Sequence, residues 1–257
     1  MKIRMVALSP IIHGEFVEGI DNGNLKPFRR IPIQHDGRVV SVPVISGNST
    51  RGALRRLLAR ELIQRFDLAS AMGKSFDKFY IAIATGGNLN KTLDKTVNSQ
   101  RLREIRVMLP PLSVLGAYLY KFNLSGMCRI GFAVPCCAEL ETGPVSLVDL
   151  VADVGLVSYV DQEQAHIPYA KPMLYTQETV IAGTELTLDV DFAPQATEVE
   201  RACILHGFNL LTAVGGKSGV GFGAVKIDPQ DDAAYIKWLK HLTAGDVAKI
   251  VDFAESL

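Results

Sequence analysis

The chain has 257 residues, of which 48% are hydrophobic and 21% charged, an ordinary composition for a globular protein with a proper core. The formal net charge is zero, from 27 basic and 27 acidic residues. No apolar run is long enough to cross a bilayer, and residues 1–8 alternate charged and apolar side chains as a strand does, unlike a signal peptide. We therefore expect a cytoplasmic protein with no membrane partner.

The zero net charge hides an asymmetry along the chain. Residues 26–60 contain eight basic residues and one acidic residue, whereas residues 139–200 contain twelve acidic residues and one basic residue. If each region stays together in the fold, the basic surface can follow a phosphate backbone and the acidic surface can meet the basic surface of a neighbouring molecule. The alternative is that the two sets of charges intermix in space.

The four cysteines, Cys128, Cys136, Cys137 and Cys203, form no Cys-x-x-Cys pair, and the five histidines show no ligand spacing with them. We expect buried free thiols and no structural zinc at these cysteines. Nothing in this pattern requires an oxidising compartment.

The chain begins with a predicted strand over residues 2–8, followed by a polar, glycine-containing loop over residues 13–28. Short extended pieces over residues 31–33 and 38–44 flank a turn at residues 35–37. The clearest helix spans residues 46–66, entered through a Ser-Gly-Asn-Ser-Thr stretch that offers N-cap residues.

Two segments in the middle of the chain read as insertions. Residues 67–105 are polar and weakly periodic, and we expect a partly helical, mobile segment. Pro110 and Pro111 then break the chain before a short apolar helix or turn over residues 112–119, and residues 127–134 form a strand. Residues 140–175 form the second candidate insertion.

The last third of the chain returns to regular patterns. Residues 184–192 alternate strictly, as a half-buried antiparallel strand does, and residues 196–214 form a second strong helix. Residues 223–227 form a strand, and residues 231–257 are helical with a break at Gly245. Without the insertions the order is strand, helix, strand, strand, helix, strand, which predicts a ferredoxin-like α+β fold and is also the skeleton of a common RNA-binding module.

Between that helix and strand lies the sequence Gly-Gly-Lys-Ser-Gly-Val-Gly-Phe-Gly, residues 215–223. A nucleotide-binding P-loop needs a glycine at position 211, which is Leu211, and it opens a helix rather than following one. A nucleotide-dependent enzyme that uses Lys217 is therefore a minor alternative. A plain turn explains one or two glycines but not five. Glycines let backbone N–H groups approach an anion and Lys217 supplies charge, so an extended phosphate backbone is the favoured ligand.

This stretch resembles the C-terminal glycine-rich loop of the RAMP superfamily of CRISPR proteins. Residues 45–55, Ile-Ser-Gly-Asn-Ser-Thr-Arg-Gly-Ala-Leu-Arg, resemble the superfamily's other motif, in which an extended segment passes through Gly-Ser-Ser into a helix with a basic residue, glycine and a following arginine. Residues 111–116, 124–130 and 178–186 are similar to the superfamily's backbone subunits. One departure is that the family loop often has an arginine where this chain has Gly219 and Val220.

The resemblance implies a single RAMP domain over residues 1–257: a ferredoxin-like palm with fingers at residues 67–105 and a thumb at residues 140–175, followed by a helical segment, 231–257, that matches nothing in the family. It implies a class 1 effector subunit, type IV-like or type III-like, that stacks along a CRISPR guide RNA with other copies of itself and with other effector subunits, for pairing with target RNA or DNA. The implied RNA-binding residues are His13, Asn48, Ser49, Arg51, Arg55, Gly215, Gly216, Lys217, Ser218 and Gly219.

Two alternatives to this assignment stay open. Arg51 and Arg55 lie near a helix N-terminus, where phosphate is favoured, but Arg55 can instead pair with a carboxylate such as Glu61. Asp21 lies in a Gly-Ile-Asp loop that resembles the type III loop whose aspartate cuts target RNA with a divalent metal such as Mg²⁺. The sequence Asp-Asn-Gly is equally typical of a simple turn. We favour guide binding without cleavage, and then expect no cofactor.

Overall fold

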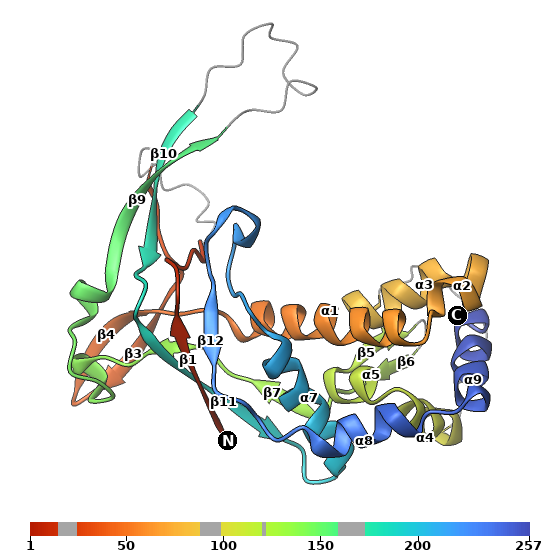
Figure 1. The fold of residues 1–257 in the computed structure, drawn as a ribbon. Helices are drawn as coiled ribbons and strands as arrows, with labels where there is room; N and C mark the ends of the chain where they lie inside the picture. Colours follow the sequence, from red (N-terminus) through yellow and green to blue (C-terminus); the bar gives the residue numbers. More distant parts are fainter. Residues whose placement is uncertain (15–24, 88–98, 120–121, 159–172) are drawn as a thin grey trace, which may run out of the picture.

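The computed structural model describes residues 1–14, 25–87, 99–119, 122–158 and 173–257. Its centre is an antiparallel sheet in the order β12-β1-β11-β7, with β8 also paired to β11 (Figure 1). The strands are β1 (Lys2–Ala7), β7 (Cys128–Ile130), β8 (Val134–Pro135), β11 (Glu185–Phe192) and β12 (Val225–Ile227). The chain order strand, helix, strand, strand, helix, strand and this sheet order together confirm the predicted ferredoxin-like α+β fold.

Helices α1 (Gly47–Arg65) and α7 (Glu198–Leu210) pack with the buried side of this sheet. Strand β11 buries Leu186, Leu188 and Val190, as its alternation predicts, and β1 buries Ile3, Met5 and Ala7 in the same way. Both helices begin at a side-chain cap. Ser46 Oγ accepts the N–H of Ser49 in α1, and Thr197 forms a capping box with Glu200 in α7.

The middle of the chain differs from the sequence prediction at two places. Helix α5 (Pro110–Leu115) begins at the proline pair rather than after it, because proline lacks only an N–H that the first helical turn does not use. The chain then forms a hairpin of β5 (Ala117–Leu119) and β6 (Phe122–Leu124) where we expected the helix to continue.

Residues 67–105 are more tightly packed than their polar sequence suggests, in the part that the structure describes. They form α2 (Leu68–Met72), a 3₁₀ turn (Gly73–Ser75), α3 (Phe76–Tyr80), a π turn (Ile81–Thr85) and α4 (Ser99–Met108). Leu68, Phe79, Ile83 and Ile105 are buried in the main hydrophobic core. The prediction of a partly helical segment is confirmed for the described residues, and their buried side chains pack these short helices against the main core.

A second lobe stands beside the palm. Here β9 (Val151–Ser158) and β10 (Met173–Val180) form a long antiparallel ribbon that rises away from the body, with β2 (Leu25–Lys26) parallel to β10 (Figure 1). This ribbon lies within the predicted thumb-like insertion and continues beyond it. The hairpin of β3 (Arg30–His35) and β4 (Arg38–Pro43) lies at its base. A small separate core joins the hairpin to the segment before β9 through Val42, Val44, Cys137, Leu147 and Leu150.

The C-terminal segment forms α8 (Ala233–His241) and α9 (Ala244–Glu255). The break between them is at Leu242 and Thr243, not at the predicted Gly245, because Thr243 caps α9 through a capping box with Asp246. Both helices bury residues in the main core, including Tyr235, Leu239 and Phe253. Among the described residues, no helix combines the length and apolar content needed to cross a bilayer. The four thiols are free, with Cys136 half-buried and the other three buried, as predicted.

A buried histidine joins three of these helices. His206 Nε2 on α7 lies 2.7 Å from Glu61 Oε2 on α1, and Nδ1 lies 2.7 Å from Asp232 Oδ2 at the start of α8. Burial alone lowers the pKa of His206, but the hydrogen bonds that the ring donates to both carboxylates outweigh burial and raise the pKa above its ordinary value. The ring is therefore held as an imidazolium that donates to both acids.

This histidine makes folding stability depend on pH. Because the pKa is higher in the folded than in the unfolded state, its contribution is complete below about pH 6.5 and declines as pH rises through the folded-state pKa. We expect His206→Gln to cost about 2 kcal/mol in the free energy of unfolding at pH 6 and progressively less at higher pH. Urea unfolding of RNA-free protein between pH 6 and pH 9 measures this, with His241→Gln on exposed α8 surface as control. Parallel pH profiles for wild type and His206→Gln would disprove the role.

Candidate nucleic-acid interface

Residues 8–13, which follow β1, connect three parts of the molecule through backbone contacts. Ile11 exchanges two hydrogen bonds with Val180 at the end of β10, with N···O distances of 2.8 and 3.0 Å. The carbonyl of Ile12 accepts the N–H of Gly216 at 2.7 Å, and that of Pro10 accepts the N–H of Gly223 at 2.9 Å. The glycine-rich loop is therefore fixed at both ends to this segment.

His13 links the same segment to helix α1. Its Nε2 atom accepts the backbone N–H of Ser46 at 3.1 Å, immediately before the first helical residue. Ser46 in turn caps the helix, and the residues after it include exposed Asn48 and half-buried Ser49. Three stretches that the sequence singled out separately, around His13, around Asn48 and around Gly216, thus meet through Ile12 and His13.

The glycine-rich loop projects into solvent between its two anchored ends. Residues 216–221 are exposed, and Ser218–Val220 form a single 3₁₀ turn rather than the start of a helix. This geometry is inconsistent with a P-loop, in which the glycine stretch opens a helix. Lys217 adopts a left-handed backbone conformation with φ of 57°. An exposed lysine flanked by glycines on a short loop suits contact with an extended anion.

Four of the five glycines of this loop fall into two groups, and the fifth, Gly221, has a positive φ of 94° but meets nothing within 4 Å. A Cβ on Gly215 would lie 2.3 Å from the carbonyl oxygen of Ile12, and one on Gly223 would lie 2.0 Å from that of Val214. Both therefore need to be glycine for the protein's own folding. Gly219 meets nothing within 4 Å, and Gly216 makes only ordinary contact, with neither showing a positive φ. Steric contacts within the protein therefore do not require glycine at these two positions.

The guanidinium groups of Arg51 and Arg55 make hydrogen bonds within the protein. Both guanidinium groups donate to the carbonyl of Leu115 at the end of α5, Arg55 Nη2 at 2.8 Å, and Arg51 also donates to Cys128. Arg55 is only 8% exposed, and burial together with the neighbouring charge of Arg51 lowers the pKa of Arg55 to about 10. The structure gives these two residues a structural role, and it offers no support for a phosphate contact by Arg55. The alternative partner Glu61 instead contacts His206.

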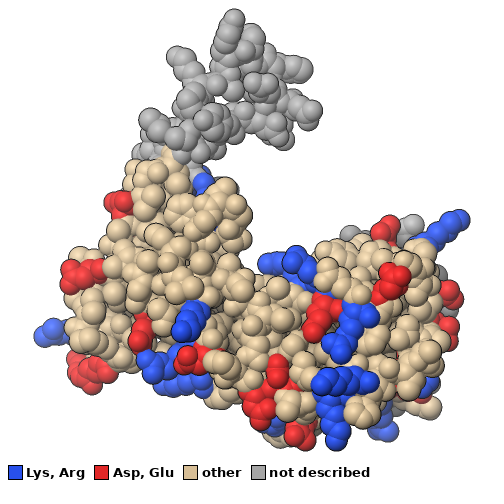
Figure 2. All heavy atoms as spheres, viewed as in Figure 1, with Lys and Arg blue, Asp and Glu red and all other residues tan. Residues whose placement is uncertain are grey.

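Other arginines of α1 are better placed to meet a ligand. Arg56, Arg60 and Arg65 are exposed, and Figure 2 shows basic side chains standing on the edge of the molecule above α1, next to the notch between the helical body and the ribbon lobe. Sequence reasoning missed Arg56 and Arg60. Helical spacing could have identified them. Arg51 and Arg55 precede the buried Leu58 and Leu62 by seven residues, which is two helical turns, so they lie on the core-facing side of α1. Arg56 and Arg60 each follow a buried residue by one position, which turns them towards solvent.

The charge asymmetry of the sequence is partly neutralised in the fold. Arg30, from the basic region, pairs with Glu178, from the acidic region, at 2.5 Å, and neither side chain is fully exposed. Figure 2 shows basic and acidic side chains side by side on the lower face of the molecule. Charges of the basic and acidic regions therefore intermix in part, which is the alternative that the sequence left open.

The open face of the sheet lacks the features of an RNA-stacking surface. RNA-binding modules of this topology present aromatic side chains on the central strands. Here the outward positions of β1 and β11 carry Lys2, Arg4, Asp189 and Asp191, and Arg4 pairs with Glu185 at 2.5 Å. A surface occupied by internal ion pairs is poorly suited to base stacking, which leaves the glycine-rich loop and α1 as the candidate interface.

Asp21 lies outside the described residues, so the structure gives no geometry for it. The described residues on either side of it are held together, because Gly14 bridges Phe28 and the N–H of Arg29 donates to the carbonyl of His13 at 2.7 Å. Residues 13–14 and 28–29 are therefore paired with each other on either side of the undescribed segment. The tip of the ribbon, residues 159–172, and residues 88–98 of the finger-like segment also lie outside the described residues.

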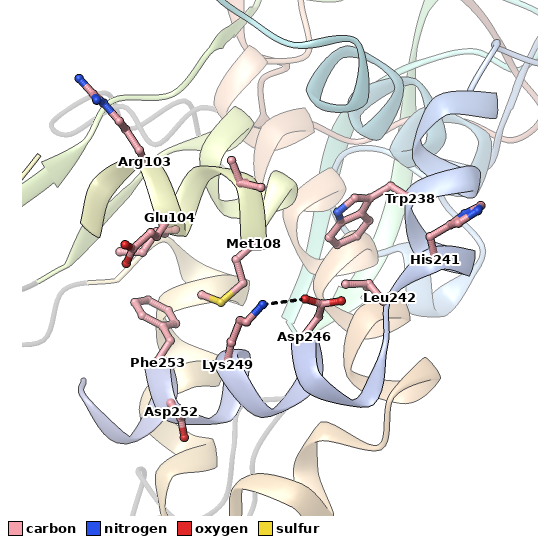
Figure 3. A pocket seen from close by; sticks show the side chains of 12 residues that line it. Arg103, Glu104, Met108, Trp238, His241, Leu242, Asp246, Lys249, Asp252 and Phe253 are labelled. Atoms are coloured by element: carbon pink, nitrogen blue, oxygen red, sulfur yellow. Dashed lines mark hydrogen bonds and ion pairs between the residues drawn. The ribbon is translucent and has the colours of Figure 1, made fainter. Parts of the chain in front are cut away.

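A pocket of about 820 Å³ lies elsewhere, between α4, α8 and α9 (Figure 3). Met108, Trp238, Leu242 and Phe253 line it, and Lys249 and Asp246 form an ion pair of 3.1 Å on its wall. None of the predicted RNA-binding residues contributes to this pocket.

No family model matches the chain, and a search of curated proteins finds no relative. Among solved structures, the chain is similar to a chain of a Type IV-B CRISPR complex, with 24% sequence identity and a TM-score of 0.61. The similarity covers 90% of each chain. At this level of identity the likeness establishes a shared fold over nearly the whole chain.

Proposed function

We propose that this protein is a guide-RNA-binding backbone subunit of a class 1 CRISPR effector complex. One observation carries the proposal: residues 8–13 hold both the exposed glycine-rich loop and, through His13, the start of α1, beside the notch of the molecule. The shared fold with a chain of a Type IV-B CRISPR complex supports it independently. In this function the subunit holds the phosphate backbone of the guide and presents the bases for pairing with target.

The proposal extends to assembly along the guide. A subunit that grips a short stretch of RNA covers a whole guide only in several copies, together with other effector subunits. The ribbon of β9 and β10 reaches away from the palm, as a contact to a neighbouring copy requires (Figure 1). Binding of this kind is dominated by phosphate contacts and is therefore sensitive to salt.

Co-expression with a CRISPR array tests the proposal directly. The chain is purified with its array transcript, and the nucleic acid that accompanies it is sequenced. Discrete repeat–spacer RNA on a large assembly is the expected result. A monomer that carries no RNA, or one that carries random cellular RNA, even when the neighbouring effector genes are co-expressed, would contradict it.

RNA cleavage is a second candidate function, because residues 13–14 and 28–29, which flank the segment that contains Asp21, pair with each other, and His13 contacts the start of α1. If Asp21 binds a divalent metal and helps position the 2′-hydroxyl, Asp21→Ala should abolish Mg²⁺-dependent cutting of target RNA and leave guide binding unchanged. Gel analysis of labelled target RNA measures cutting, and Asp252→Asn on the exposed surface of α9 is the control. Cutting that survives Asp21→Ala would exclude this residue as the catalytic group.

A further inference from the structure

His35, Asp36 and Glu141 form a cluster on the lobe that carries the β3–β4 hairpin. His35 is the last residue of β3, and Asp36 is the first residue of the two-residue turn into β4. Glu141 follows the 3₁₀ turn Ala138–Leu140, more than 100 positions further along the chain. The small core of this lobe packs the hairpin against that later segment and so brings the three side chains together.

The three side chains face one another without forming hydrogen bonds. Nε2 of His35 lies 3.8 Å from Asp36 Oδ2 and 3.7 Å from Glu141 Oε1, too far for a hydrogen bond. That nitrogen is buried and has no hydrogen-bond partner in the part of the chain that the structure describes. One polar atom of each residue lies within 4.8 Å of the others. A buried, unpartnered imidazole nitrogen that faces two carboxylates therefore needs an explanation.

A metal ion of ordinary bond length fits between the three atoms. A point equidistant from atoms at these spacings lies about 2.4 Å or less from each, close to the ~2.0–2.2 Å bonds of zinc to nitrogen and oxygen. The carboxylates are 78% and 73% exposed, so small rotations of both side chains close the remaining difference. The imidazole, at the end of the hairpin, is the least exposed of the three side chains, at 30%.

We propose that His35, Asp36 and Glu141 bind one zinc ion. Imidazole with two carboxylates is a ligand set that zinc accepts, whereas Mg²⁺ and Ca²⁺ prefer oxygen ligands alone. Three protein ligands leave a further position of the ion open to water or to a group from another molecule. The ion ties the β3–β4 hairpin to the segment before β9, beside the small core. The site is independent of the proposed RNA-binding function.

Calorimetric titration of chelator-treated, RNA-free full-length protein with ZnCl₂ tests this site. We expect one zinc ion with a Kd in the range of about 10 μM or tighter, weakened at least about tenfold by Glu141→Gln and by Asp36→Asn. His35→Gln should abolish it, and His241→Gln on α8 should leave it unchanged. Both carboxylate variants are on exposed side chains, so circular dichroism should show them folded.

A second readout separates the site from loose surface binding. Zinc should raise the Tm of wild-type protein and of His241→Gln but not that of Glu141→Gln. Wild-type protein that binds no zinc at about 100 μM would overturn the proposal. So would zinc affinity that is unchanged in folded Asp36→Asn and Glu141→Gln, since the three groups would then be only an ion pair around a protonated His35.

Discussion

Gly215→Ala in the glycine-rich loop is expected to destabilise the protein by about 3 kcal/mol. Gly215 has a φ of +79°, which costs a residue with a side chain about 1–3 kcal/mol. Its new Cβ would also lie 2.3 Å from the carbonyl oxygen of Ile12, so the backbone at residues 8–13 would have to shift. Urea unfolding of RNA-free protein measures the change in the free energy of unfolding.

Gly219→Ala is the matched control in the same loop. Its Cβ meets nothing within 4 Å and its φ is not positive, so stability should change by less than about 0.5 kcal/mol. If guide RNA passes close to the loop, this folded variant should nevertheless bind RNA more weakly. Equal losses of stability in Gly215→Ala and Gly219→Ala would show that the anchoring of the loop to Ile12 is wrong.

Lys217→Glu is expected to lower affinity for single-stranded RNA by about tenfold at low salt and to reduce the salt dependence of binding by about one released ion. Lys217 is exposed on the loop between its anchored ends. The reversal replaces one phosphate contact with repulsion but touches no core residue. Fluorescence anisotropy with a labelled single-stranded RNA at several salt concentrations measures both quantities.

Lys226→Glu is the control for net charge. Lys226 is exposed on β12, on the side of the sheet opposite buried Val225, so it carries the same charge change away from the loop. If the loop contacts RNA, Lys226→Glu should lose much less RNA affinity than Lys217→Glu. If both reversals weaken binding to the same extent, the loop is not the contact surface and the attraction depends only on overall charge.

The topology could be predicted from the sequence because strand alternation and helix caps are local signals. The alternation at Leu186, Leu188 and Val190 and the cap at Ser46 each fix an element without reference to distant residues. The helices of residues 67–105 were harder, because each is held by one or two buried side chains such as Phe79 and Ile105. Five-residue helices show too few turns for a period to be recognised.

The candidate site was predictable only in part. Its segments were visible as glycine-rich or helix-capping stretches, but their meeting depends on backbone bonds of Ile12, which no side-chain pattern reveals. The burial of Arg55 could have been expected from its seven-residue spacing to Leu62, which places both on the same side of α1. The cluster of His35 and Glu141 is hidden for another reason: its members are more than 100 residues apart, and only the small core of the lobe joins them.

The contacts of residues 10–13 have a mechanical consequence. This short segment is bonded to the ribbon through Ile11, to the glycine-rich loop through Ile12 and to the start of α1 through His13. Any tilt of the ribbon pulls on the same backbone that holds the loop, so the two cannot move independently. A neighbour that favours one tilt of the ribbon would then change the affinity of the loop for its ligand, and by thermodynamic linkage an occupied loop would favour that neighbour to the same degree. If copies assemble along a guide as proposed, this shared segment would couple the contact between neighbours to occupancy of the loop.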